Sequence, residues 1–355
     1  MKKNISLLLA GAALALTATQ AQAVRTSGGS FGSTLNGVPA AVNLGAMHST
    51  TYTEFTNTKE SVDAIMNSLF ARPDKGAMGV KEERRWGLWA GGDWTKIRDK
   101  TRGGSWDTHL FSALVGADYY CNQYVTAGLA LNYGHFHGDT AFNKGTIRDD
   151  AYGVVPYLKV SFLKWLGFDL AGGWSRVNKQ RDRVDLTAAS GQGRNVYGNV
   201  SSDRWFIAPS FRLAYQANEK IGLFGRLGYS YARDNQNAFQ ESDGSVYGSQ
   251  KFNLNRLHVK LQMAYQWTDS VKPFIFGLYA HDFTVKSQGL LLESATNLAQ
   301  GYANPEQHRS KNTWGLGTGV SFLADNNWSG VVSYTFKRNS NVETNGVNMK
   351  VRYSF

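Results

Sequence analysis

The chain has 355 residues, of which 38 are Lys or Arg and 27 are Asp or Glu, so that its formal net charge is +11. Its mean hydropathy of -0.36 excludes a bundle of membrane-spanning helices, because each such helix needs about 20 consecutive apolar residues. The single cysteine, Cys121, excludes an internal disulfide, while 38 glycines and an aromatic content of 13% are consistent with a β-barrel.

The amino terminus has the features of a secretory signal peptide. Lys2 and Lys3 precede an uncharged apolar run from about residue 5 to residue 16. Ala21 and Ala23 then supply the small residues that a signal peptidase reads. We therefore expect residues 1–23 to be cleaved and the protein to be exported.

Residues 24–84 are expected to form a flexible segment that contains one short helix. Residues 24 to about 53 are rich in Gly, Ser, Thr and Asn and lack periodicity. From residue 57 to 71, apolar residues recur at helical spacing, with Asn57 as an N-cap and Glu60 three residues later. The apolar residues of this predicted amphipathic helix are Val62, Ile65, Met66, Leu69 and Phe70.

From residue 85 to residue 355 the sequence predicts twelve strands joined by alternately short and long connections. Tight turns on one side and long Gly-, Asn- and Ser-rich loops on the other are typical of the periplasmic turns and extracellular loops of an outer-membrane barrel. The long loops are expected over residues 138–149, 178–202, 234–251 and 287–309. The strands are expected near Trp86–Ile97, Thr108–Tyr120, Tyr124–Phe136, Asp150–Phe162, Trp165–Val177, Arg204–Gln216, Ile221–Ala232, Phe252–Trp267, Lys272–Val285, Lys311–Leu323, Trp328–Lys337 and Asn345–Phe355.

Side chains alternate along these strands between apolar and polar. In the strand near Arg204, one face carries Trp205, Ile207, Pro209, Phe211, Leu213 and Tyr215, and the other carries Arg204, Ser210, Arg212 and Gln216. A soluble β-sandwich would bury such an apolar face in a core. Aromatic residues at the strand ends favour lipid instead, because they are typical of interfacial girdles. The sequence therefore predicts an all-β, twelve-stranded antiparallel transmembrane barrel.

The face opposite the lipid collects positive charge. The cations on this predicted lumenal face are Lys159, Arg204, Arg212, Arg226, Arg256, Lys260, Lys337, Lys350 and Arg352, against few acids, chiefly Asp118 and Asp169. A positive lumen would attract anions into the pore. The alternative is a ladder of charges that is satisfied by its own members, by water or by a plug.

No catalytic constellation is recognisable in the sequence. His281-Asp282, or the pair His135 and His137, would suit a surface hydrolase, but no Ser stands in a nucleophile context. No metal-ligand spacing beyond that His pair, and no Gly-rich phosphate loop, is present. The cations follow strand parity and are not gathered with stacking aromatics, so nucleic acid is not expected as a partner.

The barrel region resembles the translocator domain of autotransporters. The similar stretches are Trp86-Gly87-Leu88-Trp89-Ala90-Gly91-Gly92, Leu114-Val115-Gly116-Ala117-Asp118-Tyr119-Tyr120 and Val351-Arg352-Tyr353-Ser354-Phe355, together with the order of the twelve strands. The resemblance implies a helix that runs through the pore, with Glu60 and Asp63 meeting the lumenal cations. The terminal strand, with Tyr353 and Phe355, resembles the signal by which the barrel-assembly machinery recognises outer-membrane proteins. Only about sixty residues separate Ala23 from the first strand, which is too few for the usual folded passenger.

We therefore expect a translocator-like or plugged barrel in the bacterial outer membrane, without a catalytic site or cofactor. Its expected partners are outer-membrane lipid and the assembly machinery. One alternative is an open, anion-preferring, porin-like channel, which the excess of lumenal cations favours. A surface hydrolase that uses His281 is a further alternative.

Overall fold

A computed structural model describes residues 85–100, 106–140, 144–185, 194–244, 246–288, 292–293, 310–324, 327–340 and 342–355. These residues all belong to one compact unit. The predicted signal peptide and the segment 24–84, with its helix at 57–71, lie outside the described residues.

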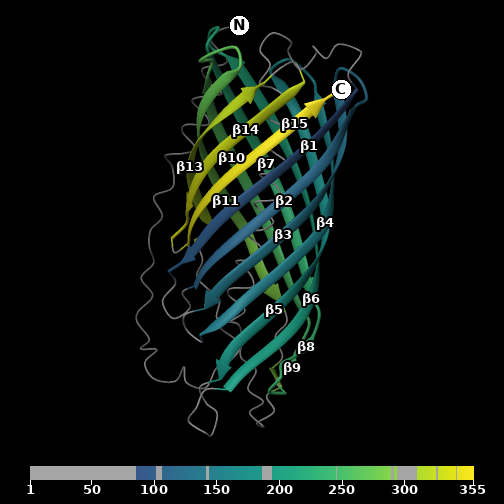
Figure 1. Ribbon diagram of the computed structural model, residues 1–355, viewed down its shortest axis with the longest axis vertical. Coiled ribbons are helices and arrows are strands. Elements are labelled where there is room, and N and C mark those ends of the chain that lie inside the picture. The colour runs from purple at the N-terminus through teal and green to yellow at the C-terminus, as the bar shows by residue number, and fades with distance from the viewer. Residues whose placement is uncertain are drawn as a thin grey trace. The chain divides into compact units, whose positions relative to one another are not determined.

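Twelve antiparallel strands form a closed barrel, as the sequence predicted (Figure 1). Around the barrel the order is β1-β15-β14-β13-β11-β10-β7-β6-β5-β4-β3-β2, so strands that follow one another along the chain are neighbours. The strands are β1 (Trp86–Asp99), β2 (Trp106–Tyr120), β3 (Val125–Thr140), β4 (Gly145–Ser161), β5 (Leu166–Asp185), β6 (Arg194–Gln216), β7 (Ile221–Gln236), β10 (Gln250–Tyr265), β11 (Val271–Gln288), β13 (Asn312–Leu323), β14 (Trp328–Arg338) and β15 (Val342–Ser354).

The barrel closes where the first strand pairs with the last. The register of β1 with β15 runs from Gly87 opposite Ser354 to Asp99 opposite Val342. At the end of this seam, the amides of Trp86 and Phe355 each donate to the other's carbonyl, at 3.1 and 3.0 Å. Closure leaves no barrel strand with an unpaired edge, which is what a lipid environment requires.

Exposure alternates along β6 as the sequence predicted. Phe211 and Tyr215 are 51% and 54% exposed, whereas Arg204 and Arg212 are 3% and 4% exposed. The apolar outer face of β6 runs from Trp205 to Tyr215, which is ten residue-to-residue steps along the strand. At about 3.3 Å per residue and a tilt near 40° this is a band roughly 25 Å tall, the height of a transmembrane apolar belt.

The turn-side ends of the strands lie within two residues of their predicted positions because local turn chemistry fixes them. The Asn122 carboxamide oxygen accepts hydrogen bonds from the amides of Tyr124 and Val125, at 2.8 and 2.9 Å. Asn218 does the same for Lys220 and Ile221 in the turn before β7. Side-chain caps of this kind are readable from the sequence.

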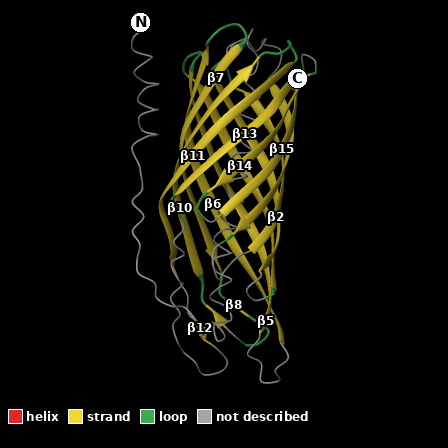
Figure 2. Ribbon diagram, turned by 90° about the vertical axis from the view of Figure 1, so that its left-hand side faces the viewer, coloured by secondary structure: helices red, strands yellow, loops and turns green. Residues whose placement is uncertain are grey.

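The loop-side ends of β4 to β7 extend beyond their predicted limits. The loop expected over 178–202 is wrong in extent, since residues 178–185 and 194–202 continue β5 and β6 (Figures 1 and 2). Beyond the aromatic boundary at Trp174 and Trp205 the outer face becomes polar, with Arg176 and Asp203 paired at 2.8 Å. On β5 both faces are then hydrophilic, with Lys179, Arg181 and Arg183 on the inner one, so the apolar alternation that marks a strand is lost there.

Three short strands lie in the connections outside the barrel wall. They are β8 (Phe239–Gln240), β9 (Val246–Tyr247) and β12 (Leu292–Glu293), and they pair in the order β12-β9-β8. The connection after β7 therefore pairs with the connection after β11. Both belong to the end of the barrel that carries the long connections.

Candidate functional site in the barrel interior

The structure places the nine predicted lumenal cations on the inner face of the wall. Eight of them are at most 9% exposed, and Lys260 is partly buried. Their outward neighbours, such as Phe211 and Leu261, are 51% and 44% exposed. Six of the nine belong to three groups: a central cluster, a cluster at the seam and a ladder toward the long connections. The other three, Arg256, Lys337 and Lys350, lie on the inner face outside these groups.

The central cationic cluster comprises Lys159, Arg212, Arg226 and Lys260, and Asp169 is paired with Arg212 and Arg226. Asp169 forms an ion pair with Arg212, whose Nε lies 2.7 Å from its carboxylate, and accepts a hydrogen bond from Arg226 Nη2 at 2.6 Å. Arg212 of β6 stands opposite Arg226 of β7, which in turn stands opposite Lys260 of β10. Lys260 also lies over the ring of Phe276, 3.8 Å from its centroid. Like charges directly opposite one another destabilise a sheet, so this row concentrates positive charge at a cost to the fold.

The seam cluster comprises Trp89, Asp118, Tyr120, Tyr157 and Arg352. The Arg352 guanidinium is paired with Asp118 and donates to the Tyr120 hydroxyl at 2.7 Å. The Tyr157 hydroxyl donates to Asp118 and accepts from Trp89 Nε1 at 2.7 Å. These contacts join β15 to β2, β4 and β1 on the inner face.

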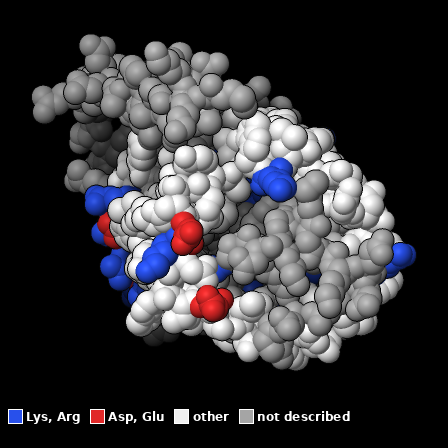
Figure 3. Space-filling view, turned by 90° about the horizontal axis from the view of Figure 1, so that it is seen from above, with Lys and Arg blue, Asp and Glu red and all other residues white. Residues whose placement is uncertain are grey.

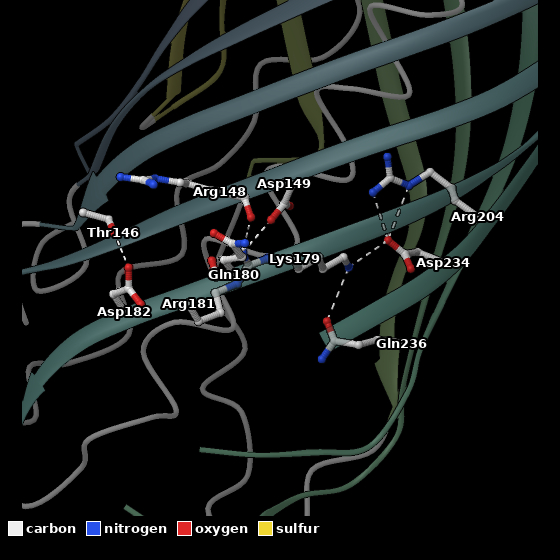
Figure 4. Close-up of polar contacts among 10 residues, drawn as sticks. All are labelled: Thr146, Arg148, Asp149, Lys179, Gln180, Arg181, Asp182, Arg204, Asp234 and Gln236. Atoms are coloured by element: carbon white, nitrogen blue, oxygen red, sulfur yellow. Dashed lines mark hydrogen bonds and ion pairs between the residues drawn. The ribbon is translucent and has the colours of Figure 1, made fainter. Parts of the chain in front are cut away.

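A ladder of ion pairs continues toward the long connections (Figure 4). Asp234 of β7 accepts from Arg204 at 3.0 Å and from Lys179 at 3.2 Å, and Lys179 also donates to Gln236. Arg181 of β5 is paired with Asp149 of β4 at 2.5 Å. Each pair is buried within the part of the wall that extends beyond the apolar band.

The connection after β7 is held against the inner wall by Arg183 of β5. Arg183 donates to Glu241 at 2.6 Å and to Asp243 at 2.7 Å, while the Tyr247 hydroxyl donates to Glu241 at 3.1 Å. Burial alone would lower the pKa of Arg183, but hydrogen bonding to Glu241 and the charge of that carboxylate raise it above its ordinary value. The connection is thus fixed by a buried guanidinium.

Sequence reasoning missed most of the acids in the interior. Among the described residues, eleven Lys and Arg and eight Asp and Glu are buried, so positive charge exceeds negative by less than was expected. The acids beyond Asp118 and Asp169 are Asp93, Asp99, Asp149, Asp234, Glu241 and Asp282. Strand parity would have found Asp149 and Asp234 if β4 and β7 had been extended.

Several large inner side chains lie flat on the wall because a glycine faces them on the neighbouring strand. A Cβ at Gly228 would meet the His258 imidazole, and one at Gly317 would meet the Phe276 ring. Gly87 is covered in the same way by the Arg352 guanidinium. Side chains that lie along the wall leave the centre of the lumen wider than if they pointed across it.

The residues considered for catalysis do not form a catalytic arrangement in the structure. His281 lies partly exposed on the outer face, where its Nδ1 is 2.7 Å from the Asn312 carboxamide oxygen. Asp282 faces inward and pairs with Arg256 at 2.6 Å, so strand parity separates the two members of the His281-Asp282 motif. His135 is partly exposed and contacts Asp150 at 2.8 Å.

The described residues contain no group of three or more His, Cys, Asp or Glu that would hold a metal ion. No helix that is long and apolar enough to cross a membrane occurs among them. Cys121 is free and exposed in the turn after β2. Viewed onto the turn end, Lys and Arg gather along one side of the barrel and stand singly elsewhere, some of them beside Asp or Glu (Figure 3).

Comparison with known families identifies the barrel. The model of the autotransporter β-domain matches residues 88–335, which is more than half of the chain. The chain belongs to the autotransporter β-domain family. It is accordingly a bacterial outer-membrane protein with a translocator-type barrel. A comparison with curated protein sequences found no match.

Solved translocator barrels share the fold of this autotransporter β-domain. The translocator domain of NalP from Neisseria meningitidis superposes with a TM-score of 0.64 at 14% identity, covering 84% of this chain and 98% of that one. The β-domain of BrkA from Bordetella gives 0.58 at 14% identity, covering 76% and 100%. The transport unit of AIDA-I from Escherichia coli gives 0.53 at 14% identity, covering 83% and 99%.

Proposed function

We propose that this β-domain is a plugged translocator whose lumen holds the predicted helix at residues 57–71. The observation that supports it best is the inner row of Arg212, Arg226 and Lys260 on three successive barrel strands. Cations in such a row repel one another. An acidic partner inside the lumen would offset that repulsion.

The predicted helix has the charge and the size for this position. Glu60 and Asp63 are three residues apart, so they lie on one face of a helix and can approach the same part of the wall. A helix of fifteen residues is about 22 Å long, close to the height of the apolar band. The flat packing of His258 and Phe276 on the wall is consistent with a lumen that accommodates a helix about 10 Å wide.

Two of the similar structures have this role in their own proteins. The NalP structure is a translocator domain and the AIDA-I structure is a transport unit. We infer that this β-domain likewise conducts a polypeptide segment across the outer membrane and that its helix closes the pore afterwards.

The competing function is an open channel that prefers anions. It is supported by the excess of buried cations over buried acids among the described residues. An open channel and a plugged barrel differ in the effect of the helix on conductance, so charge reversal within the helix separates them.

The test is single-channel conductance of the mature chain refolded into planar bilayers. Glu60→Lys with Asp63→Lys should expel the helix from the cationic cluster and raise the time-averaged conductance at least fivefold. Arg212→Glu with Arg226→Glu should restore the low conductance when combined with the helix variant. An unchanged conductance in the helix variant would contradict the proposal.

A matched control lies in the same segment. Glu82→Lys with Glu83→Lys makes the same change of charge closer to the first strand and outside the predicted helix. It should leave the conductance within twofold of the parent protein. A rise equal to that of the helix variant would show that charge alone, and not its place in the helix, opens the pore.

We also propose that the outer face of β15 is the surface that the barrel-assembly machinery reads. The rings of Tyr353 and Phe355 stack at 5.8 Å, and Trp328 packs on Tyr353 at 4.9 Å. Removal of Phe355 should reduce insertion into the outer membrane. The measurement is the fraction of the protein in unheated samples that migrates on a gel as the folded barrel. Full insertion of the shortened chain would refute this role.

A further inference from the structure

The seam between β1 and β15 differs from every other contact in the barrel wall. Each other pair of neighbouring strands is joined by a connection of the chain, whereas β1 and β15 are the first and last strands and are joined by none. Their pairing therefore depends on non-covalent contacts alone. An opened seam would expose backbone amides to lipid, which is costly.

Arg352 reaches over the seam and continues past it. It belongs to β15, yet its guanidinium is paired with Asp118 and hydrogen-bonded to Tyr120, both on β2. The side chain crosses β1 at Gly87, where a Cβ would collide with the guanidinium. Its path requires β1 to lie in place between β15 and β2.

The carboxylate that receives Arg352 is itself held in position. Asp118 is fully buried and accepts from the Tyr157 hydroxyl of β4, which is in turn hydrogen-bonded by Trp89 of β1. The contacts therefore include strands on both sides of the seam. A carboxylate buried in this way loses strongly stabilising contacts when its guanidinium partner leaves.

We propose that Arg352 and Asp118 form a latch that holds the barrel seam closed. The latch joins strands that are two apart around the wall, so it forms only after β1 and β15 have paired. Interactions that form after the folding transition state slow unfolding and leave the folding rate nearly unchanged. The latch should therefore control how long the seam stays shut, independently of what the lumen holds.

The experiment compares Asp118→Asn with Asp282→Asn in protein refolded into lipid vesicles. Asp118→Asn leaves the last strand unaltered, so recognition of the terminal residues is preserved. Asp282 is also buried and pairs with Arg256 at 2.6 and 3.0 Å, but β10 and β11 are connected in sequence. The two variants remove similar charges from a seam contact and from an ordinary wall contact.

We expect Asp118→Asn to unfold in urea at least tenfold faster than the parent while its folding rate stays within twofold. Hydrogen exchange should rise in residues 86–92 and 348–355 and stay unchanged in β5 and β6. Asp282→Asn should leave exchange at the seam unchanged. Equal exchange at the seam in both variants, or no change in Asp118→Asn, would overturn the latch.

A disulfide between β1 and β15 should cancel the effect of Asp118→Asn. Ala90 of β1 and Val351 of β15 are paired outward neighbours, so Ala90→Cys with Val351→Cys in a Cys121→Ser background would staple the seam. In the oxidised protein the effect of Asp118→Asn on seam exchange should vanish, and it should return on reduction. Persistence of the effect in the stapled protein would contradict the proposal.

A milder variant covers the case in which Asp118→Asn does not fold. Tyr120→Phe removes a single hydrogen bond from Arg352 and leaves the ion pair in place. It should accelerate unfolding two- to fivefold, with the rise in exchange confined to the same two segments. Unchanged exchange there would also count against the latch.

Discussion

Phe211→Arg tests whether the outer face of β6 contacts lipid. Phe211 is 51% exposed and lies between the boundary aromatics Trp205 and Tyr215, within about 3 Å of the middle of the apolar band. An arginine at the midplane costs about 2–4 kcal/mol. Loss of the ring contact with Phe168, whose centroid is 5.4 Å away, adds about 1 kcal/mol. The expected destabilisation is therefore about 3–5 kcal/mol, or two to three and a half orders of magnitude in the unfolding constant.

Tyr197→Arg is the matched control for depth. Tyr197 lies on the same face of the same strand and is 62% exposed, but it stands about 20 Å beyond the boundary at Trp205. Its replacement should change the free energy of unfolding by less than about 0.5 kcal/mol. Urea unfolding in lipid vesicles, followed by tryptophan fluorescence, measures both variants. Equal losses at the two positions would refute the assignment of this face to lipid.

Three further perturbations test the interior and the rim. Arg183→Gln should release the connection after β7, so that proteolysis within residues 237–249 becomes faster while the gel mobility of the folded barrel is unchanged. An equal rate of proteolysis in the parent protein would show that Arg183 does not hold this connection. Gly317→Leu should destabilise the barrel by about 1–3 kcal/mol because the new side chain collides with Phe276, and an unchanged urea midpoint would show that the ring can move away. The hydrogen bond from Lys100 lowers the pKa of Glu343, so this carboxylate stabilises the fold above its unfolded pKa near 4.3 and loses that contribution as the pH falls through its lower folded value. Glu343→Gln should therefore flatten the acid side of the stability profile, and an identical profile would argue against the contact.

The sequence predicted the wall better than the interior. The outer face of each strand contacts lipid and the inner face contacts the lumen, so apolar and polar residues alternate along the sequence. Phe211 next to Arg212 is an example. Turn caps such as Asn122 and Asn218 fixed the turn-side ends. Closure between β1 and β15 was expected from the predicted transmembrane barrel, because a barrel in lipid must leave no open strand edge.

The partners of the lumenal charges were not predictable in the same way. Parity gives the face of Arg204, but not that Asp234 lies within 3.0 Å of it, because that distance depends on the stagger between β6 and β7. The loop-side extensions were missed because polar side chains on both faces of β5 remove the apolar contrast. The path of Arg352 across Gly87 depends on the register of a seam whose strands lie at opposite ends of the barrel sequence.

The most direct test is the single-channel conductance of the chain without its predicted signal peptide, residues 1–23, beside a variant that also lacks residues 54–71. If the predicted helix fills a pore lined by the central cationic cluster, the deletion should open a large, anion-selective conductance that the parent protein shows only rarely. Identical conductance and selectivity in the two proteins would contradict the account.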